Sequence, residues 1–581
     1  MSVLNASKRS LISENVAHFQ QAISDYLSGE LDQTEFTPLR LRNGLFFQNG
    51  ESMLRIAIPD GVMSASQLRH LADLQRRFAD GRGHFTTRQN IQLYQARLEQ
   101  VPQLIGELAA SGLYTMQTSG PCIRAVTIDP LAGLAAEEVT DPRPWSELLR
   151  HWATLHQGFA NLPRKLKIAI STRADDRSAL RAHDIGLRIT GGSAEQSRFE
   201  IWIGGGLGRR PALAKLLYAD IPGSELLLYL EAILRVYDRD GQRHDKQRAR
   251  LKSFVEERGI ANIRSAVAAE LEAIAADEQA LAELSIDASS YAAAVASLPG
   301  LNPRSGEYEV LTADLLDVWA RADAEFGRWL LWNSQPQSRE ERRAVTVCLR
   351  GRGQAAGNIT SAELEQLASL AQWVNGGELR CTQQQNILIP HVPLNRLYGL
   401  WQELRNAGLA EPIAGSPSCP LACPGKGACE LANTATGAVT ELIHERLSTS
   451  PAAKELGDTQ LAISGCMNGC SHHAISEIGL RGVSKNGHDW FQFVIGGSPR
   501  GDLRLGQLLG PAVPQEQVPD VVEALAERYQ ELRLRPSESF SAVVARVGVK
   551  PFRSALHAQP KREILCDSNS YVISTKSFAT T

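Results

Sequence analysis

The chain has 581 residues, a formal net charge of −3 and an isoelectric point near 6.5. This near-neutral balance gives no reason to expect nucleic acid or an anionic membrane as a partner, and no apolar run approaches the ~18 residues that span a bilayer. The length predicts about three or four domains. Because residues 1–10 lead into an amphipathic stretch without the apolar core of a signal peptide, we expect a cytoplasmic protein with reduced thiols and no disulfide framework.

Residues 54–94 resemble residues 345–390, at an offset of 296 residues. The matched positions are Leu68, Leu71, Leu74 and Phe78 with Leu364, Leu367, Leu370 and Val374, and Gln89-Asn90-Ile91 with Gln385-Asn386-Ile387. In each copy the apolar spacing predicts a strand, a helix and a second strand, followed by another helix. The expected helix caps are Ser64 or Ser66 in the first copy and Ser361 in the second.

A second pair of segments, 199–217 and 491–509, matches at an offset of 292 residues and carries Ile-Gly-Gly at 203–205 and 495–497. The order is therefore module A, module B, module A, module B, which indicates an internally duplicated protein with a pseudo-twofold arrangement. Residues 262–297 between the halves, rich in alanine and glutamate, are expected to form a solvated helical connection. The tail after about residue 558 is expected to be disordered.

The segment HFTTRQNIQLY (84–94) alternates strictly and predicts one strand with a polar face. That face holds His84, Thr86, Arg88, Asn90, Gln92 and Tyr94. In the second copy the same face reads Arg380, Thr382, Gln384, Asn386, Leu388 and Pro390. A face that only meets water has little reason to be polar in one copy and half apolar in the other, so we favour ligand binding in the first copy.

Four further cations lie in the first half: Arg55, Arg124, Lys165 and Lys167. Arg55 interrupts an apolar strand, and the two lysines share one face of KLKIAIS. Each residue alone is more often a surface or ion-pair residue, because a buried cation is costly unless it is paired. Taken together, the four predict a cage for a small, multiply charged anion.

Two close pairs of cysteines occur in glycine-rich stretches of the second half, Cys423 with Cys429 and Cys466 with Cys470. Four thiolates on two loops are the ligand set of a [4Fe–4S] cluster. Structural zinc is the alternative, although zinc sites favour two to four residues between paired cysteines, and the gaps here are five and three. Cys419 is an alternative to Cys423 as a ligand. The remaining thiols are expected to be small buried hydrophobes: Cys122, Cys348, Cys381 and Cys566.

Over residues 15–555 the chain resembles the siroheme-dependent assimilatory sulfite and nitrite reductases. The matching motifs are MLR, TTRQN, R-x-V-T-x-D-P-L-A-G, LPRKLKIAIS, C-x5-C and SGCMNGC. Three further segments, DPRPW, GCMNGCSHH and GGSPRGDLRLGQLLGP, are more similar to bacterial sulfite reductase hemoproteins than to nitrite reductases.

The resemblance implies an α+β fold in which ferredoxin-like βαβ modules alternate with mixed α/β modules that hold siroheme and the [4Fe–4S] cluster. The implied ranges are an N-terminal extension (1–45), a first ferredoxin-like module (46–117) and a first siroheme and substrate module (118–300). A connector (301–340), a second ferredoxin-like module (341–410), a siroheme and [4Fe–4S] module (411–557) and a disordered tail (558–581) follow.

The resemblance also implies roles for single residues. The cluster ligands would be Cys423, Cys429, Cys466 and Cys470, with Cys470 also the axial ligand of the siroheme iron. Sulfite would bind Arg55, Arg124, Lys165 and Lys167. The siroheme contacts would be His84, Thr86, Arg88, Gln92, Tyr94, Asn468 and Cys470.

The implied activity is six-electron reduction of sulfite to sulfide, with electrons from a ferredoxin or a separate flavoprotein subunit, because the chain has no room for a flavin or NADPH domain. The alternatives are a ferredoxin-dependent nitrite reductase and a non-catalytic iron–sulfur or zinc protein on the same fold. Ala125 and Met467 differ from the residues that the family commonly has at these positions. Some relatives also have other residues at the positions of His84 and Tyr94, so the siroheme roles of these two are the weaker assignments. His472 and His473 are expected to pack or to form hydrogen bonds and not to bind metal.

Overall fold

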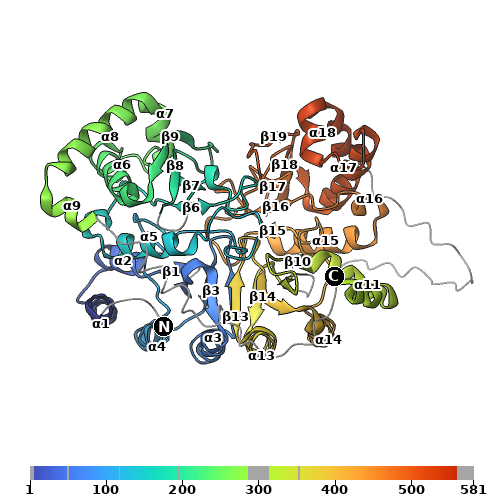
Figure 1. Cartoon of the computed structure of the whole chain (residues 1–581), viewed down its shortest axis with the longest axis horizontal. Helices are drawn as coiled ribbons and strands as arrows, with labels where there is room; N and C mark the ends of the chain where they lie inside the picture. The colour runs from blue at the N-terminus through green and yellow to red at the C-terminus, as the bar shows by residue number, and fades with distance from the viewer. Residues whose placement is uncertain are drawn as a thin grey trace, which may run out of the picture.

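The computed structural model describes residues 6–48, 51–116, 118–192, 196–284, 313–350 and 354–558. Two lobes of helix and sheet, one from each half of the chain, stand side by side on a shared base of two further sheets (Figure 1). The tail that was expected to be disordered and Cys566 lie outside the described residues.

The first half builds one side of the base and the green lobe of Figure 1. Its base elements are α1 (Ala6–Ser28), α2 (Gln33–Arg42), β1 (Leu45–Gln48), β2 (Glu51–Ala57), β3 (Val62–Ser64), α3 (Ala65–Phe78), β4 (Arg82–Phe85), β5 (Asn90–Tyr94) and α4 (Val101–Ala110). Its lobe comprises α5 (Arg143–Leu155), β6 (Ile168–Ser171), β7 (Ile185–Gly191), β8 (Arg198–Ile203), β9 (Lys215–Pro222), α6 (Leu226–Asp240), α7 (Leu251–Arg258), α8 (Ile260–Ala275) and α9 (Glu278–Leu284).

The second half repeats the order of the base elements, whereas its lobe has a six-stranded sheet in place of the four-stranded sheet of the first lobe. Its base elements are α11 (Ala313–Ala322), α12 (Ala324–Asn333), β10 (Ser334–Pro336), β11 (Arg342–Val347), β12 (Asn358–Thr360), α13 (Ser361–Asn375), β13 (Glu378–Cys381), β14 (Ile387–Pro393) and α14 (Leu397–Asn406). Its lobe comprises β15 (Leu421–Ala422), α15 (Thr436–Thr449), α16 (Pro451–Lys454), β16 (Leu461–Ser464), β17 (Ile478–Lys485), β18 (His488–Ile495), β19 (Gln507–Leu508), β20 (Val513–Pro514), α17 (Val518–Leu532) and α18 (Phe540–Val547).

The two halves exchange strands in the base. One sheet has the order β1-β2-β5-β4-β12 and the other β10-β11-β14-β13-β3, so β12 completes the sheet of the first half and β3 completes that of the second. Two equivalent glutamines also form hydrogen bonds between the halves. Gln89 of the first half donates to the carbonyl of Cys381, and Gln385 of the second half donates to the carbonyl of Phe85, both at 3.2 Å. The predicted duplication and the α+β, ferredoxin-like class are confirmed.

Three large hydrophobic cores, and two small clusters of four buried residues each, stabilise the described part of the chain. One is shared by both ferredoxin-like modules, and each lobe has its own. The shared core also contains Phe36 from the segment predicted as an extension and Trp329 from the segment predicted as a connector. These two segments therefore help to bury the apolar faces of the base instead of lying apart from it.

Three local predictions are wrong. Residues 84–94 do not form one strand but a β4–β5 hairpin, with Gln89 at a φ of 53° in the turn. The cap of α13 is Thr360 and not Ser361, whereas Ser64 caps α3 as expected. The stretch 262–284 is helical but not simply solvated, because Val267 and Ile274 of α8 are fully buried; residues 285–297 lie outside the described part.

Within the described residues, no helix is both long enough and apolar enough to cross a membrane.

Candidate active site

The cysteine loops leave the same edge of the sheet in the second lobe. Strands β15 and β16 are parallel neighbours, with Ala422 opposite Ile463, so their carboxyl ends lie side by side. Cys423 follows β15 directly and Cys466 lies two residues after β16. The backbone N–H of Gly465 donates to the Cys423 sulfur at 3.1 Å and ties the two loops together.

Gly465 is required by close packing at this junction. A Cβ atom at this position would lie 2.8 Å from the carbonyl oxygen of Thr434, on the loop that follows the first cysteine pair. The missing side chain therefore lets the two cysteine loops approach each other.

The charge of Cys470 acts on the other three cysteines of the two loops. Burial, and then the negative charge of Cys470, raises the pKa of Cys423 to about 12, and burial raises the pKa of Cys429 and Cys466 with smaller contributions from Cys470. Thiolates at such a site need a positive partner, and iron ions supply that charge. The donor set therefore fits an iron–sulfur cluster.

No group of three or more His, Cys, Asp or Glu side chains in the described ranges is close enough to share one metal ion.

The hairpin of the first half reaches the second cysteine loop. Thr87, in the turn between β4 and β5, donates from its hydroxyl to the carbonyl of Cys470 at 2.8 Å. Arg88 donates to Thr127 at 3.0 Å and to the carbonyl of Ala125 at 2.6 Å, and Thr86 caps the turn by accepting from the N–H of Arg88. The predicted polar segment thus lies between the cysteine loops and the cations of the first lobe.

Arg55 and Arg124 are brought together at one carbonyl. Both donate to the backbone oxygen of Thr118, Arg55 at 3.1 Å, and Arg124 also donates to Gly120 at 2.9 Å. In the orientation that satisfies its neighbours, the Gln92 amide accepts from Arg55 and donates to the Tyr94 hydroxyl at 2.8 Å. Neither arginine forms an ion pair with a carboxylate of the described residues.

Lys165 and Lys167 lie just before β6 and project from the face opposite the buried Leu166 and Ile168. Burial, followed by the charges of Arg124 and Arg250, lowers the pKa of Lys165 to about 8. Burial, followed by the charge of Arg88, lowers the pKa of Lys167 well below its usual range. Among the described residues, neither ammonium group has a hydrogen-bond or ion-pair partner.

The cation cage, defined here as Arg55, Arg88, Arg124, Lys165, Lys167 and Arg250, has very few negative partners. Within the described chain its one ion pair joins Arg250 to the fully buried Asp184 at 2.8 Å. Buried cations of like charge repel one another and are stable only if an anion joins them. The cage therefore fits a ligand that carries several carboxylates, together with a small anion.

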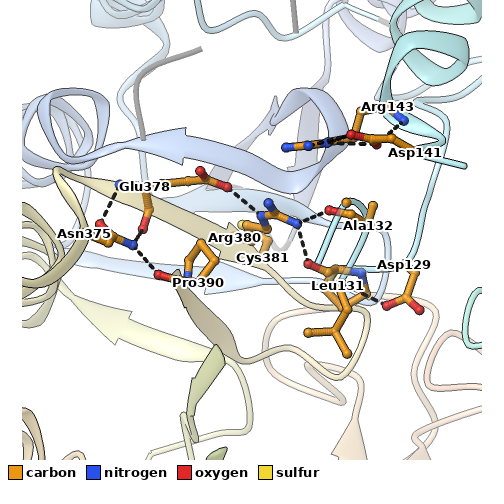
Figure 2. A network of polar contacts seen from close by, with 12 residues as sticks. Asp129, Leu131, Ala132, Asp141, Arg143, Asn375, Glu378, Arg380, Cys381 and Pro390 are labelled. Carbon is orange, nitrogen blue, oxygen red and sulfur yellow. Dashed lines mark hydrogen bonds and ion pairs between the residues drawn. The ribbon is translucent and has the colours of Figure 1, made fainter. Parts of the chain in front are cut away.

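The matching place in the second half is closed by side chains. At the position that corresponds to His84, Arg380 is 1% exposed, pairs with Glu378 at 2.7 Å and donates to the carbonyls of Pro130 and Ala132 (Figure 2). Leu388, at the position of Gln92, packs with Leu131, Leu134 and Ala344. The two copies therefore differ: the first has cations with few negative partners, and the second has a paired arginine and apolar side chains in the same place.

The remaining predicted residues lie at the rim of the site. His84 is buried, with Nδ1 bonded to Asn358 at 2.9 Å and Nε2 facing Gln385 at 3.3 Å, so both ring nitrogens already have partners from the second half. Asn468 is exposed on the loop that carries Cys466 and Cys470. His473 bonds to Ser464 at 2.8 Å, in line with the hydrogen-bonding role expected for it.

Sequence reasoning missed Arg250 and Thr87. Arg250 stands in a charged stretch, KQRARLK, that has no visible relation to the cage until α7 folds against β8. Thr87 was placed on the far face of a single strand, and the hairpin turn brings it to Cys470 instead.

The comparisons with known proteins agree with this geometry. The profile of the nitrite and sulphite reductase 4Fe-4S domain matches residues 119–274 and 416–563, and that of the nitrite/sulfite reductase ferredoxin-like half domain matches residues 47–111 and 337–407. The chain therefore belongs to the nitrite and sulfite reductase family. Siroheme and a [4Fe–4S] cluster are the cofactors of this family and of this chain.

Relatives within the family carry both activities in their names. The chain is 28% identical to a ferredoxin–nitrite reductase of Synechococcus elongatus, over 83% of this chain and 86% of the relative. It is 25% identical to a sulfite reductase [ferredoxin] of Mycolicibacterium paratuberculosis, over 86% and 83%. The structure of the NirA protein of Mycobacterium tuberculosis shares the fold, with a TM-score of 0.71 at 23% identity, over 93% of this chain and 97% of that one.

Proposed function

We propose that this oxidoreductase is an assimilatory sulfite reductase. The reaction takes one sulfite, six electrons and seven protons to one hydrosulfide ion and three waters, so atoms and charge balance. The observation that carries the proposal is the cation cage, in which two lysine ammonium groups have no protein partner among the described residues.

Cys423, Cys429, Cys466 and Cys470 would hold the cluster, and Cys470 would also face the siroheme iron. Two features support this assignment: the electrostatic effect of Cys470 on the other three cysteines, and the Thr87 contact that brings Cys470 to the first half. When bound, the two cofactors supply the electron transfer and the iron site at which sulfur–oxygen bonds are broken.

The protein's own contribution is positional and electrostatic. Arg88, Gln92 and Tyr94 line the hairpin side of the cage and would meet siroheme carboxylates, together with Thr86 in the same hairpin. Asn468, on the loop that carries Cys466 and Cys470, would be a further siroheme contact. Arg55 and Arg124 present fixed donors, whereas the lysines can also deliver protons, because burial has already lowered the pKa of Lys165 to about 8. Positive groups fixed before the reaction stabilise the oxygens as charge develops on them.

Charge favours sulfite over nitrite as the substrate. Sulfite carries up to two negative charges on three oxygens, and nitrite one charge on two oxygens. Arg55, Arg124, Lys165 and Lys167, none of which forms an ion pair with a carboxylate of the described residues, match the more highly charged anion. Nitrite reduction is the second candidate, and it is favoured by the names of several relatives.

The electron donor would be a separate protein. The names of the relatives point to a ferredoxin more than to a separate flavoprotein subunit.

Steady-state kinetics of the holoenzyme with reduced ferredoxin, with sulfite and nitrite in parallel, test the proposal. We expect a kcat/KM for sulfite at least tenfold above that for nitrite, and a loss of this preference in Lys167→Asn. A higher kcat/KM for nitrite would replace the proposal by its alternative, and an absence of both activities in a fully loaded protein would overturn it.

A further inference from the structure

A second cysteine cluster lies outside the site described above. It consists of Cys348, which follows β11, Cys419 on the loop before β15, and the side chains of Arg350 and Asn386. We refer to these four residues as the thiol pair cluster. The mechanism uses none of them.

Arg350 shows that the cluster needs a negative charge. Its side chain is 1% exposed, and it donates to the carbonyls of Pro420 and Gln384 and to the amide oxygens of Asn386 and Gln385. All of these acceptors are neutral, and no carboxylate of the described residues pairs with it. A permanent cation at such a depth is costly without an anion.

The Cys419 sulfur is the group placed to be that anion. Arg350 donates to it at 3.5 Å and Asn386 at 3.8 Å, and the Cys348 thiol is in hydrogen-bonding contact with it. Burial alone raises the pKa of Cys419, but the hydrogen bond from Cys348 and the charge of Arg350 outweigh it and bring this pKa below its usual range. The same contact and burial raise the pKa of Cys348.

A thiolate that is partly exposed, beside a cation and in contact with a second thiol is the arrangement of an oxidant-sensitive cysteine with a resolving partner. Cys419 is half-buried and Cys348 is fully buried, so a small oxidant reaches Cys419 first. We propose that Cys419 and Cys348 form a peroxide-sensitive dithiol, separate from the cofactor site, that closes to a disulfide.

The chemistry needs hydrogen peroxide as the oxidant. The Cys419 thiolate attacks one peroxide oxygen, the O–O bond breaks and hydroxide leaves, which gives a sulfenic acid. The Cys348 sulfur then attacks the Cys419 sulfur, the S–O bond breaks and water leaves with the Cys348 proton. The two thiols lose two electrons and two protons, and the peroxide becomes two waters.

Peptide mapping of the holoenzyme tests the proposal. The protein is treated anaerobically with a small excess of hydrogen peroxide, blocked with N-ethylmaleimide and digested with trypsin without reduction. Cys348 lies in the peptide 344–350 and Cys419 in 406–426, which also carries Cys423, so fragment ions between residues 420 and 422 assign the bond. We expect a 348–419 disulfide that a dithiol reductant reverses, while the iron content stays unchanged.

Two variants test whether Cys348 is the partner that closes the disulfide. In Cys348→Ser the disulfide is lost and dimedone labels Cys419, because the sulfenic acid is no longer resolved. Cys381→Ser is the matched control, since Cys381 is equally buried and burial alone raises its pKa, and the 348–419 bond should still form in this variant.

A second readout does not depend on any variant. In the untreated holoenzyme, iodoacetamide should label Cys419 at pH 7 at least tenfold faster than it labels Cys122. The proposal is overturned if Cys419 reacts no faster than Cys122, if peroxide links it to Cys423 instead, or if it stays free at doses that already release iron.

Discussion

Replacing Lys165 with methionine should stabilise the cofactor-free protein and weaken the enzyme. The pKa of Lys165 falls from 10.5 to about 8 on folding, because of burial and then Arg124 and Arg250. At about 1.4 kcal/mol per pKa unit, the charged form costs the folded state about 3 kcal/mol at pH 7. Part of this cost is relieved by water in the half-buried site, so we expect a gain of about 1–2 kcal/mol in the free energy of unfolding.

The same substitution removes a charged donor from the anion site. Hydrogen bonds to charged groups contribute about 1.5–3 kcal/mol, which predicts a fall in kcat/KM for sulfite of roughly 10- to 100-fold. Urea unfolding of the cofactor-free protein at pH 7 measures the first effect, and steady-state kinetics of the holoenzyme measure the second.

Lys252→Met is the matched control. The pKa of Lys252 is also lowered to about 8 by burial, but its ammonium group donates to the carbonyls of Gly206, Leu207 and Arg210. Its removal leaves carbonyls unsatisfied and should cost about 1–3 kcal/mol of stability. If Lys165→Met destabilises the protein as Lys252→Met does, and kcat/KM is unchanged, the idea of an unpaired cation cage is refuted.

Three further predictions address folding and the cluster. Burial, only partly offset by the hydrogen bond to Asn358, lowers the pKa of His84 to about 4, so the folded state binds fewer protons than the unfolded state between about pH 6.5 and 4. The free energy of unfolding should therefore fall by about 2 kcal/mol from pH 7 to pH 5. In urea titrations, His84→Gln should reduce this dependence of the unfolding free energy on pH. Cys423→Ser should lose cluster iron by metal analysis whereas Cys419→Ser keeps it, and the reverse result would exchange their assignments. Gly465→Ala should lower cofactor content because its Cβ would lie 2.8 Å from a backbone oxygen. Gly437→Ala, in the helix α15, should leave cofactor content unchanged in absorption spectra, because a Cβ there would meet nothing nearer than the Ala355 side chain at 4.0 Å.

The sequence was sufficient for the plan of the fold because the repeats preserve apolar spacing. Leu68, Leu71 and Leu74 are all fully buried on α3, as the periodicity predicted. The exchange of β3 and β12 between the halves could not be predicted, because each strand has three residues and pairs with a strand nearly 300 positions away. Such pairing depends on tertiary contact and leaves no local pattern.

The sequence was sufficient for those residues of the candidate site that are marked by their charge or by their position in a cysteine loop. The polar pattern of residues 84–94 was interpreted as one strand, yet His84 and Gln92 still share a face, because they lie opposite each other in the β4–β5 hairpin. Period-two alternation cannot distinguish a strand from two strands joined by a tight turn. The roles of Arg250 and Thr87 depend on contacts between distant segments, so no local motif marks them.

One analysis tests the central claim most directly: the iron, acid-labile sulfide and siroheme content of the anaerobically purified protein, compared with that of Cys470→Ser. The wild-type chain should contain about five irons, four sulfides and one siroheme, and the variant should lose the cluster and the characteristic siroheme absorption. A wild-type protein without siroheme, or a Cys470→Ser variant with the full content of both cofactors, would contradict the account.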